Sequence, residues 1–359
     1  MPASIDRLGA STLARHLVLL ALGVVLVLLL TEWMPDYQFV HLGILGAYIC
    51  AAAGLTVLVG LNGQISLGHA ALMAIGAYTV ALLQNRFNDQ GVTGGWVMPL
   101  CLLAGLVVTA AAGAIIGVAA ARLRGPYLAG ATLALGVALP PITSHFAGLF
   151  NGDQGLSAPI AGPPLSFGYS FTFQHWQAWI GLFSALLVLF FLANLGRSAV
   201  GLHMRAVRDH EVAAQLCGLS VPRVQILTFA VSSATAGLGG GVLAIMVGAR
   251  PGSYDLVLSL TLLLAAVIGG LGSLTGAVLG SVIVVYLASF LTDRVDGLGL
   301  SAASTQKLTD NLPSAVFGLL LVIVMLAFPG GLAAVVRTLA PRRSSQSHRT
   351  DTQPTGGPS

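Results

Sequence analysis

Long apolar runs, each close to the length that crosses a lipid bilayer, recur from near the beginning of the chain almost to its end. A transmembrane helix needs about 20 predominantly apolar residues. The pattern predicts ten such segments. We therefore expect an all-α fold, a polytopic transmembrane helical bundle of about eight to ten spans within residues 17–336. The segments cover residues 17–31, 40–60, 64–84, 98–121, 126–150, 177–195, 225–248, 256–272, 275–292 and 312–336.

Two places in this pattern contain residues that break helices. Pro140 and Pro141 are expected to interrupt the segment 126–150, because proline removes a helical donor and clashes with the preceding turn. The glycine-rich stretch 269–280 fits either a tight turn between two spans or a broken helix. A break at membrane depth must be covered by protein or by water.

Composition supports a helical membrane protein. Charged residues make up 8% of the chain and hydrophobic residues 56%, whereas a soluble domain carries about 25% charged residues. A membrane β-barrel would need short alternating segments in place of long apolar runs. Cys50, Cys101 and Cys217 share no metal or redox spacing, so we expect unpaired thiols and no metal site.

Arginine is unevenly distributed over the loops between the ten segments. With the N-terminus inside, the inner segments hold twelve arginines and the outer segments four cations. Cytoplasmic loops carry such an excess of Lys and Arg. Residues 1–16, the polar loop 196–224 and the tail 337–359 are therefore expected to be cytoplasmic. The tail has no apolar pattern, so we expect it to be disordered.

The polar loop 196–224 contains the signals of a short surface helix. Glu211 lies in its first turn, where the helix dipole favours a carboxylate. Gly218 follows the helical run and is expected to end it, while Pro222 blocks any extension. The small residues Ala213 and Ala214 permit close approach of a partner.

Charged side chains are absent from all ten predicted spans. Ion-coupled carriers usually place ionisable residues at membrane depth, so an energy source outside the chain is favoured. An ATP-independent secondary carrier or channel stays an alternative, because sodium sites can use backbone carbonyls. The single lysine, Lys307, lies in no Walker A pattern, and no catalytic cluster is evident, so neither ATP binding nor enzymatic activity is predicted.

Several segments together resemble a known family of permeases. Residues 211–214 followed by Gly218 resemble the EAA loop of ABC importer permeases, the helix that docks into the ATP-binding subunit. The other matching segments resemble the branched-chain amino acid permease group and favour its M-type subunit over the shorter H-type partner. These segments are GQISLGHAA at 63–71, 122–134, NGDQGL at 151–156, SSATAGLGGG at 232–241, 267–280 and FPGGL at 328–332.

The resemblance implies a multi-pass permease subunit of a bacterial inner-membrane ABC importer for branched-chain or related amino acids. Urea or short-chain amides are the alternative substrates. The implied partners are a second, H-type permease, two ATP-binding subunits, a periplasmic substrate-binding protein and membrane lipid, with no nucleic acid. ATP is used by the partner subunits, and no cofactor is bound by this chain. The residues implied in coupling to the ATPase subunit are Arg205, Arg208, Glu211, Ala213, Ala214 and Gly218.

Three polar residues in the matching segment 63–71 have two interpretations. Gln64, Ser66 and His69 are candidates for the transport pathway or for hydrogen bonds between helices. In a continuous helix, Ser66 would share a small-residue face with Ala70, and such faces let membrane helices approach closely. Helix packing is therefore the favoured interpretation.

Overall fold

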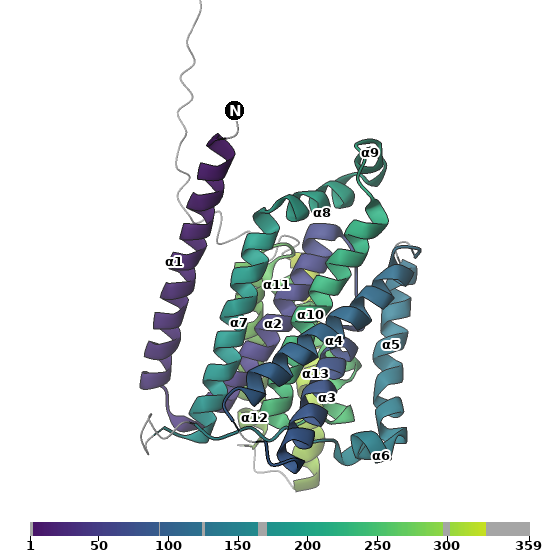
Figure 1. Ribbon diagram of the computed structural model, residues 1–359. Coiled ribbons are helices and arrows are strands. Elements are labelled where there is room, and N and C mark those ends of the chain that lie inside the picture. The colour runs from purple at the N-terminus through teal and green to yellow at the C-terminus, as the bar shows by residue number, and fades with distance from the viewer. Residues whose placement is uncertain (1–2, 93, 124–125, 164–170, 297–301, 328–359) are drawn as a thin grey trace, which may run out of the picture.

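The fold is that of a helical bundle, seen in a computed structural model that describes residues 3–92, 94–123, 126–163, 171–296 and 302–327 (Figure 1). Over these residues the secondary structure is helical, with one isolated bridge between Leu156 and Ala249. The short 3-10 helices are η1 (Asp36–Gln38), η2 (Gly152–Gln154) and η4 (Pro251–Tyr254). The α-helices are α1 (Ala3–Trp33), α2 (Phe39–Asn62), α3 (His69–Asp89), α4 (Val97–Ala120), α5 (Pro126–His145), α6 (Ala147–Phe150), α7 (Phe173–Arg197), α8 (Ala199–Asp209), α9 (Glu211–Leu216), α10 (Val221–Val247), α11 (Leu256–Gly269), α12 (Leu274–Asp296) and α13 (Ala302–Ala327).

Eight of the described helices are long and apolar enough to cross a membrane, which confirms the expected fold class. They are α1, α2, α4, α5, α7, α10, α11 with η4, and α12. The two other predicted segments fall on α3 and α13. The motif at 328–332 and the tail 337–359 lie outside the described residues.

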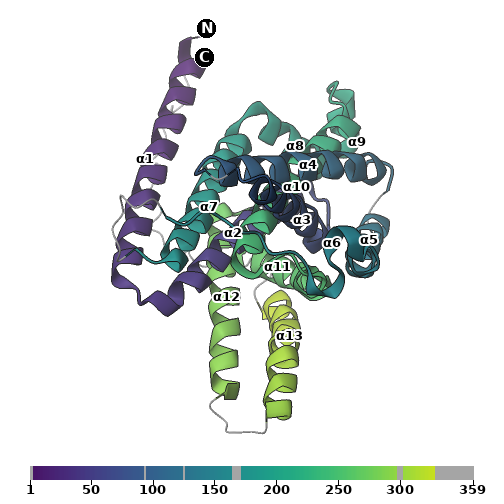
Figure 2. The same cartoon turned by 60° about the horizontal axis from the view of Figure 1, so that its bottom comes forward.

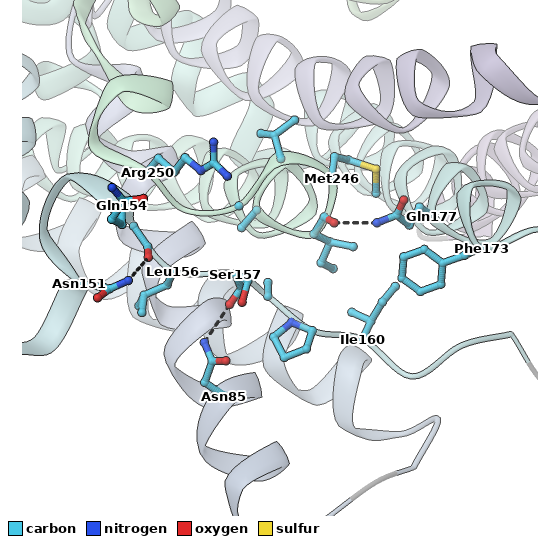
Figure 3. Close-up of a pocket in the computed structure, with 17 residues that line it drawn as sticks. Asn85, Asn151, Gln154, Leu156, Ser157, Ile160, Phe173, Gln177, Met246 and Arg250 are labelled. Carbon is cyan, nitrogen blue, oxygen red and sulfur yellow. Dashed lines mark hydrogen bonds between the residues drawn. The ribbon is translucent and has the colours of Figure 1, made fainter.

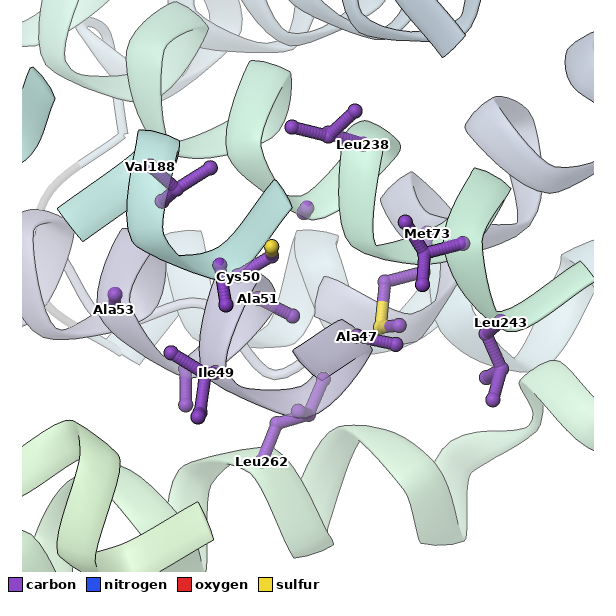
Figure 4. Packing of buried hydrophobic residues seen from close by; sticks show 14 of the residues in the cluster. Ala47, Ile49, Cys50, Ala51, Ala53, Met73, Val188, Leu238, Leu243 and Leu262 are labelled. Atoms are coloured by element: carbon purple, nitrogen blue, oxygen red, sulfur yellow. The ribbon is translucent and has the colours of Figure 1, made fainter. Parts of the chain in front are cut away.

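Helix α10 forms the centre of the bundle and packs against α2, α3 and α4. Small residues make these contacts close. A Cβ atom on Gly240 would overlap the carbonyl of Met73 in α3, and one on Gly237 would overlap Thr109 in α4. The hydroxyl of Ser232 donates to the carbonyl of Gly54 in α2 at 2.8 Å. Such small-residue contacts hold membrane helices together where water supplies no hydrophobic drive. Figure 4 shows alanines of α2 in a buried cluster to which α3, α7, α10 and α11 contribute larger side chains.

Helix α1 lies at the side of the bundle, antiparallel to α7 (Figure 2). His16 Nδ1 is 2.8 Å from Asn194 Oδ1, and the indole N–H of Trp179 donates to the hydroxyl of Thr31 at 3.2 Å. The start of α1 therefore lies at the same end of the bundle as the end of α7. Helices α8 and α9 lie at this end too (Figure 1), which we call the α8–α9 end.

Two expectations about helix breaks are corrected by the structure. The segment expected at 64–84 begins late, because residues 63–68 are not helical and α3 starts at His69. The proline pair does not interrupt α5, which runs through both prolines to His145. The prolines lie in its last two turns, so they shorten the expected segment at its end and leave its middle intact.

The glycine-rich stretch 269–280 is a tight turn followed by a new helix. Gly270 and Gly272 have φ values of 99° and 87°, a region that glycine enters without steric cost. After the turn, α12 runs back along α11. Gly276 faces Gly269, and Gly280 faces Ala265, so close that a Cβ atom on either glycine would overlap the facing backbone.

Candidate functional site

Helix α9 is a six-residue helix that projects from the α8–α9 end of the bundle (Figure 1). It follows α8, whose first turn is capped by Ser198, the hydroxyl of which accepts from the N–H of Gly201. His210 between them has an extended backbone, which separates the two helices. Ala214 is the buried residue of α9, and it packs with Val207 of α8 and Val221 of α10.

Gly218 ends α9 in the way expected from the sequence. Its φ is 83°, and its N–H donates to the carbonyl of Gln215 at 2.9 Å. The N–H of Leu219 donates to the carbonyl of Ala214 at 3.0 Å. This pair of bonds is the Schellman arrangement that satisfies the last carbonyls of a helix. The turn fixes the direction in which α9 points.

The outer face of α9 is apolar. Val212 is 61% exposed and Leu216 is 85% exposed. They are four residues apart and therefore neighbours on one face of the helix, and Ala213 beside them is exposed too. An apolar patch at the tip of a projecting helix is typical of a protein–protein contact. Sequence reasoning missed Val212 and Leu216, although their spacing within a polar loop was a usable signal.

Arg205 and Arg208 both reach inward to the bundle. One nitrogen of Arg205, Nη2, donates to the carbonyl of Gly196 at the end of α7 at 2.8 Å. Nη1 of Arg208 donates to the carbonyl of Gly60 in the last turn of α2. Nη2 and Nε of Arg208 contact Asp209 Oδ1 at 2.7 and 2.9 Å. The two arginines thus attach α8 to the ends of two membrane-spanning helices.

The chain between α2 and α3 crosses the interior of the bundle without helical structure. Gly63, with φ of 73°, ends α2, and Gly68 precedes α3. Gln64 and Ser66 are buried, whereas Ile65 between them is 48% exposed. This alternation is that of an elongated backbone, in which successive side chains point to opposite sides. The expected helical face from Ser66 to Ala70 is therefore wrong, because the two glycines stop the helix on both sides of Ser66.

Neighbouring helices hold the backbone of this segment in place. The hydroxyl of Thr132 in α5 accepts from the N–H of Leu67 at 3.0 Å. The hydroxyl of Ser259 in α11 accepts from the N–H of Ala70 at 2.9 Å. Ser259 lies in the first turn of α11, whereas the other end of α11 leads to Gly272, which packs on Gly60 near the end of α2. The start of α3 is therefore deep in the bundle.

Four polar side chains at this break are buried without a hydrogen-bond partner among the described protein groups. They are Asn62 at the end of α2, Gln64 and Ser66 in the break, and His69 at the start of α3. Buried polar groups in proteins are nearly always paired, so each exception needs an explanation. The break thus gathers four unpartnered polar side chains into a polar strip inside the bundle.

A cavity of about 900 Å³ lies at the end of the bundle opposite α9 (Figure 3). The end of α10, the start of α7 and the loop 151–160 surround it. Two side-chain amides of its wall form hydrogen bonds within the protein. Asn85 donates to the carbonyl of Ser157 and Gln177 to that of Ile245, both at 2.8 Å. Arg250 contributes a cation to the wall. Sequence reasoning found NGDQGL at 151–156 but missed the other walls, which come from distant parts of the chain.

A bundle of membrane-crossing helices, with a short projecting helix at one end and a polar cavity at the other, fits a multi-pass membrane permease. The chain belongs to the family of branched-chain amino acid transport system permease components, whose model matches residues 40–328. It is a component of a transport system and not an enzyme.

Named relatives agree with this family. The high-affinity branched-chain amino acid transport system permease protein LivM of Salmonella typhimurium is 31% identical, over 84% of this chain and 71% of that protein. LivM of Escherichia coli K12 is 32% identical, over 68% of this chain and 61% of that protein. LivH of the same strain is 26% identical, over 79% and 90% of the two chains. No solved structure matches the chain.

Proposed function

We propose that this chain is the M-type permease subunit of a bacterial inner-membrane ABC importer for branched-chain or related amino acids. Its partners would be an H-type permease, two ATP-binding subunits and a periplasmic substrate-binding protein. The observation that carries the proposal is the exposed apolar face of α9, which is held to the bundle by Ala214 and by the arginines of α8. The arginine excess in the polar loop supports a cytoplasmic location for this end.

In this proposal α9 is the docking point of the ATP-binding subunit, and α8 transmits its motion. Arg208 joins α8 to Gly60, and Gly60 packs directly on the backbone of Gly272 in the turn between α11 and α12. Movement of α8 therefore acts at once on the end of α2 and on that turn. The end of α2 leads directly into the break at 63–68. A movement of the docking helix would therefore reach the break through α8 and the end of α2.

We infer that the polar strip at the break lines the transport pathway. A branched-chain amino acid is a zwitterion with an apolar side chain, and neutral donors and acceptors offer it weak hydrogen bonds without a net charge. Weak binding suits a permease, because strong binding would slow release. The start of α3 adds the positive end of a helix dipole, which favours the substrate carboxylate.

Gln64→Leu is expected to reduce uptake about tenfold or more, the loss that corresponds to one hydrogen bond to a charged group. Replacing an unpartnered buried amide by an apolar group of similar shape leaves folding unchanged or improves it. Thermal unfolding should therefore stay at or above the wild-type temperature while uptake of labelled leucine falls. Ile65→Val, on the exposed side of the same segment, is the matched control and should transport normally. Normal uptake by Gln64→Leu would remove the break from the pathway.

Reconstitution of the chain with its partner subunits in proteoliposomes tests the proposed function. We expect saturable uptake of leucine that requires ATP and the binding protein, with little competition from urea or acetamide. Uptake that continues without ATP would identify a secondary carrier or channel. Competition by urea or acetamide at the same concentration as leucine would support the amide alternative.

A further inference from the structure

Two adjoining cavities form a groove between α1, α7 and α12. The first, of about 220 Å³, lies at the α8–α9 end and has Arg197 and Arg205 in its wall. The second, of about 270 Å³, continues along the apolar faces of the three helices. His16, Ala193, Leu274 and Thr275 line both cavities, so the two adjoin. The groove thus has a polar head and an apolar extension.

The head of the groove is suited to an anion. Arg197 and Arg205 are exposed there, and neither forms an ion pair within the described part of the chain. The carbonyl of Gly196 takes one N–H of Arg205, and a guanidinium has five N–H donors. Helix α12, 23 residues long, begins at this cavity, and its N-terminus adds a positive partial charge.

Further polar groups complete this head. Thr56 of α2 lines the cavity, is 1% exposed, and its hydroxyl has no hydrogen-bond partner among the described groups. The hydroxyls of Ser273 and Thr275 lie on the opposite wall, 2.9 Å from each other. Among the residues that the structure describes, no acidic side chain lines the cavity. Hydroxyls and guanidinium groups around a helix N-terminus are the donors that bind phosphate oxygens.

The extension of the groove is suited to a hydrocarbon chain. Leucines of α1 and α7 and Val278 of α12 form its wall. The extension opens on the side of the bundle where α1 packs against α7, and Leu19 of α1 is 55% exposed there. In a membrane protein this surface faces lipid. Basic pockets between transmembrane helices at the cytoplasmic side are typical sites for anionic lipid head groups.

We propose that this groove binds an anionic phospholipid of the leaflet at the α8–α9 end. The phosphate is held by Arg197, Arg205 and the N-terminus of α12, and one acyl chain fills the apolar extension between α1 and α12. The lipid then bridges the peripheral helix α1 to the helices that carry α8. The proposal rests on the membrane location of the chain and not on its substrate.

Lipid titration of the full-length chain in a neutral detergent tests this site. Phosphatidylglycerol should raise the unfolding temperature, and phosphatidylcholine should not. Arg197→Gln should weaken the apparent affinity for phosphatidylglycerol about fivefold, the effect of one cation near an anionic lipid. Val278→Trp should reduce binding by filling the extension. Arg122→Gln, an exposed arginine outside the groove, is the matched control and should bind as the wild type does.

Three results would overturn the proposal. Inorganic phosphate that matches the effect of phosphatidylglycerol would show an anion site without a role for the acyl chain. Equal affinity of Arg197→Gln and wild type would exclude the arginine from the site. Native mass spectrometry of the assembled permease complex should find phosphatidylglycerol retained by wild type and reduced in Arg197→Gln. A complex that never retains the lipid would exclude the groove as a lipid site in the assembly.

Discussion

Leu216→Asp is expected to abolish ATP-driven uptake while the chain still enters the membrane and folds. Leu216 is 85% exposed, so the substitution removes little packing within the chain. In the proposed docked complex the same side chain is buried, and an unpaired carboxylate there is costly. Central interface residues of this kind contribute about 2 kcal/mol or more, which is about a 30-fold change in affinity. Co-purification of the ATP-binding subunits and uptake of leucine measure the two effects.

Leu216→Met is the control for this experiment, because it keeps an apolar side chain of similar size and should keep both docking and uptake. Size-exclusion chromatography and thermal unfolding of both variants exclude a folding defect. If Leu216→Asp still co-purifies with the ATP-binding subunits and transports normally, the apolar face of α9 is not their docking surface. In that case the arginine contacts of α8 would lose their proposed role in coupling as well.

Gly240→Leu is expected to prevent assembly of the bundle. Gly240 lies where α10 crosses α3, and any Cβ atom would overlap the backbone carbonyl of Met73, which a rotamer change cannot relieve. The hydroxyl of Tyr254 in η4, just before α11, also donates to the carbonyl of Gly240 at 3.2 Å, which ties η4 to this crossing. Separating these elements would cost several kcal/mol, a large part of the roughly 5–15 kcal/mol that stabilises a typical protein. Fluorescence-detected size-exclusion chromatography of a tagged chain should show aggregate and little monodisperse protein.

Gly130→Leu provides the comparison for the same substitution elsewhere in the membrane domain. Gly130 lies in α5, and a Cβ atom there meets nothing within 4 Å. This variant should elute like the wild type, so a defect confined to Gly240→Leu would locate the effect at the α3–α10 crossing. A monodisperse Gly240→Leu variant would mean that α3 and α10 do not pack at the separation described.

Hydropathy predicted most of the fold because a segment that crosses lipid must be apolar along its length. It must also pair its own backbone groups, which a helix does. The end of α9 was predicted too, since Gly218 supplies a backbone conformation that other residues avoid. The break at 63–68 was missed because apolarity does not distinguish a helix from an elongated segment inside protein. Gly63 and Gly68 were its local signals. The proline pair led to a wrong expectation of a helix break, because prolines near the end of a helix need not interrupt it.

The candidate site was only partly predictable for a different reason. The residues of the polar loop are contiguous, so Glu211 could be placed in the first turn of a short helix and Gly218 just past its end from the sequence. The groove and the far cavity each combine residues from several helices, such as Arg197 with Thr275 and Asn85 with Arg250. No spacing in the chain indicates such a combination, because it is set by the packing of helices that are distant in sequence.

The buried polar groups at the break also have a thermodynamic consequence. Each unpaired group costs about 1–3 kcal/mol relative to a solvated one. With Asn62, Gln64, Ser66 and His69 all buried, this arrangement carries a desolvation cost that hydration of the break would release. Opening this part of the bundle is therefore favoured locally and opposed by helix packing elsewhere. Desolvation at the break thus offsets part of the packing free energy, so opening there needs less input at α8 than separation of a fully apolar contact would.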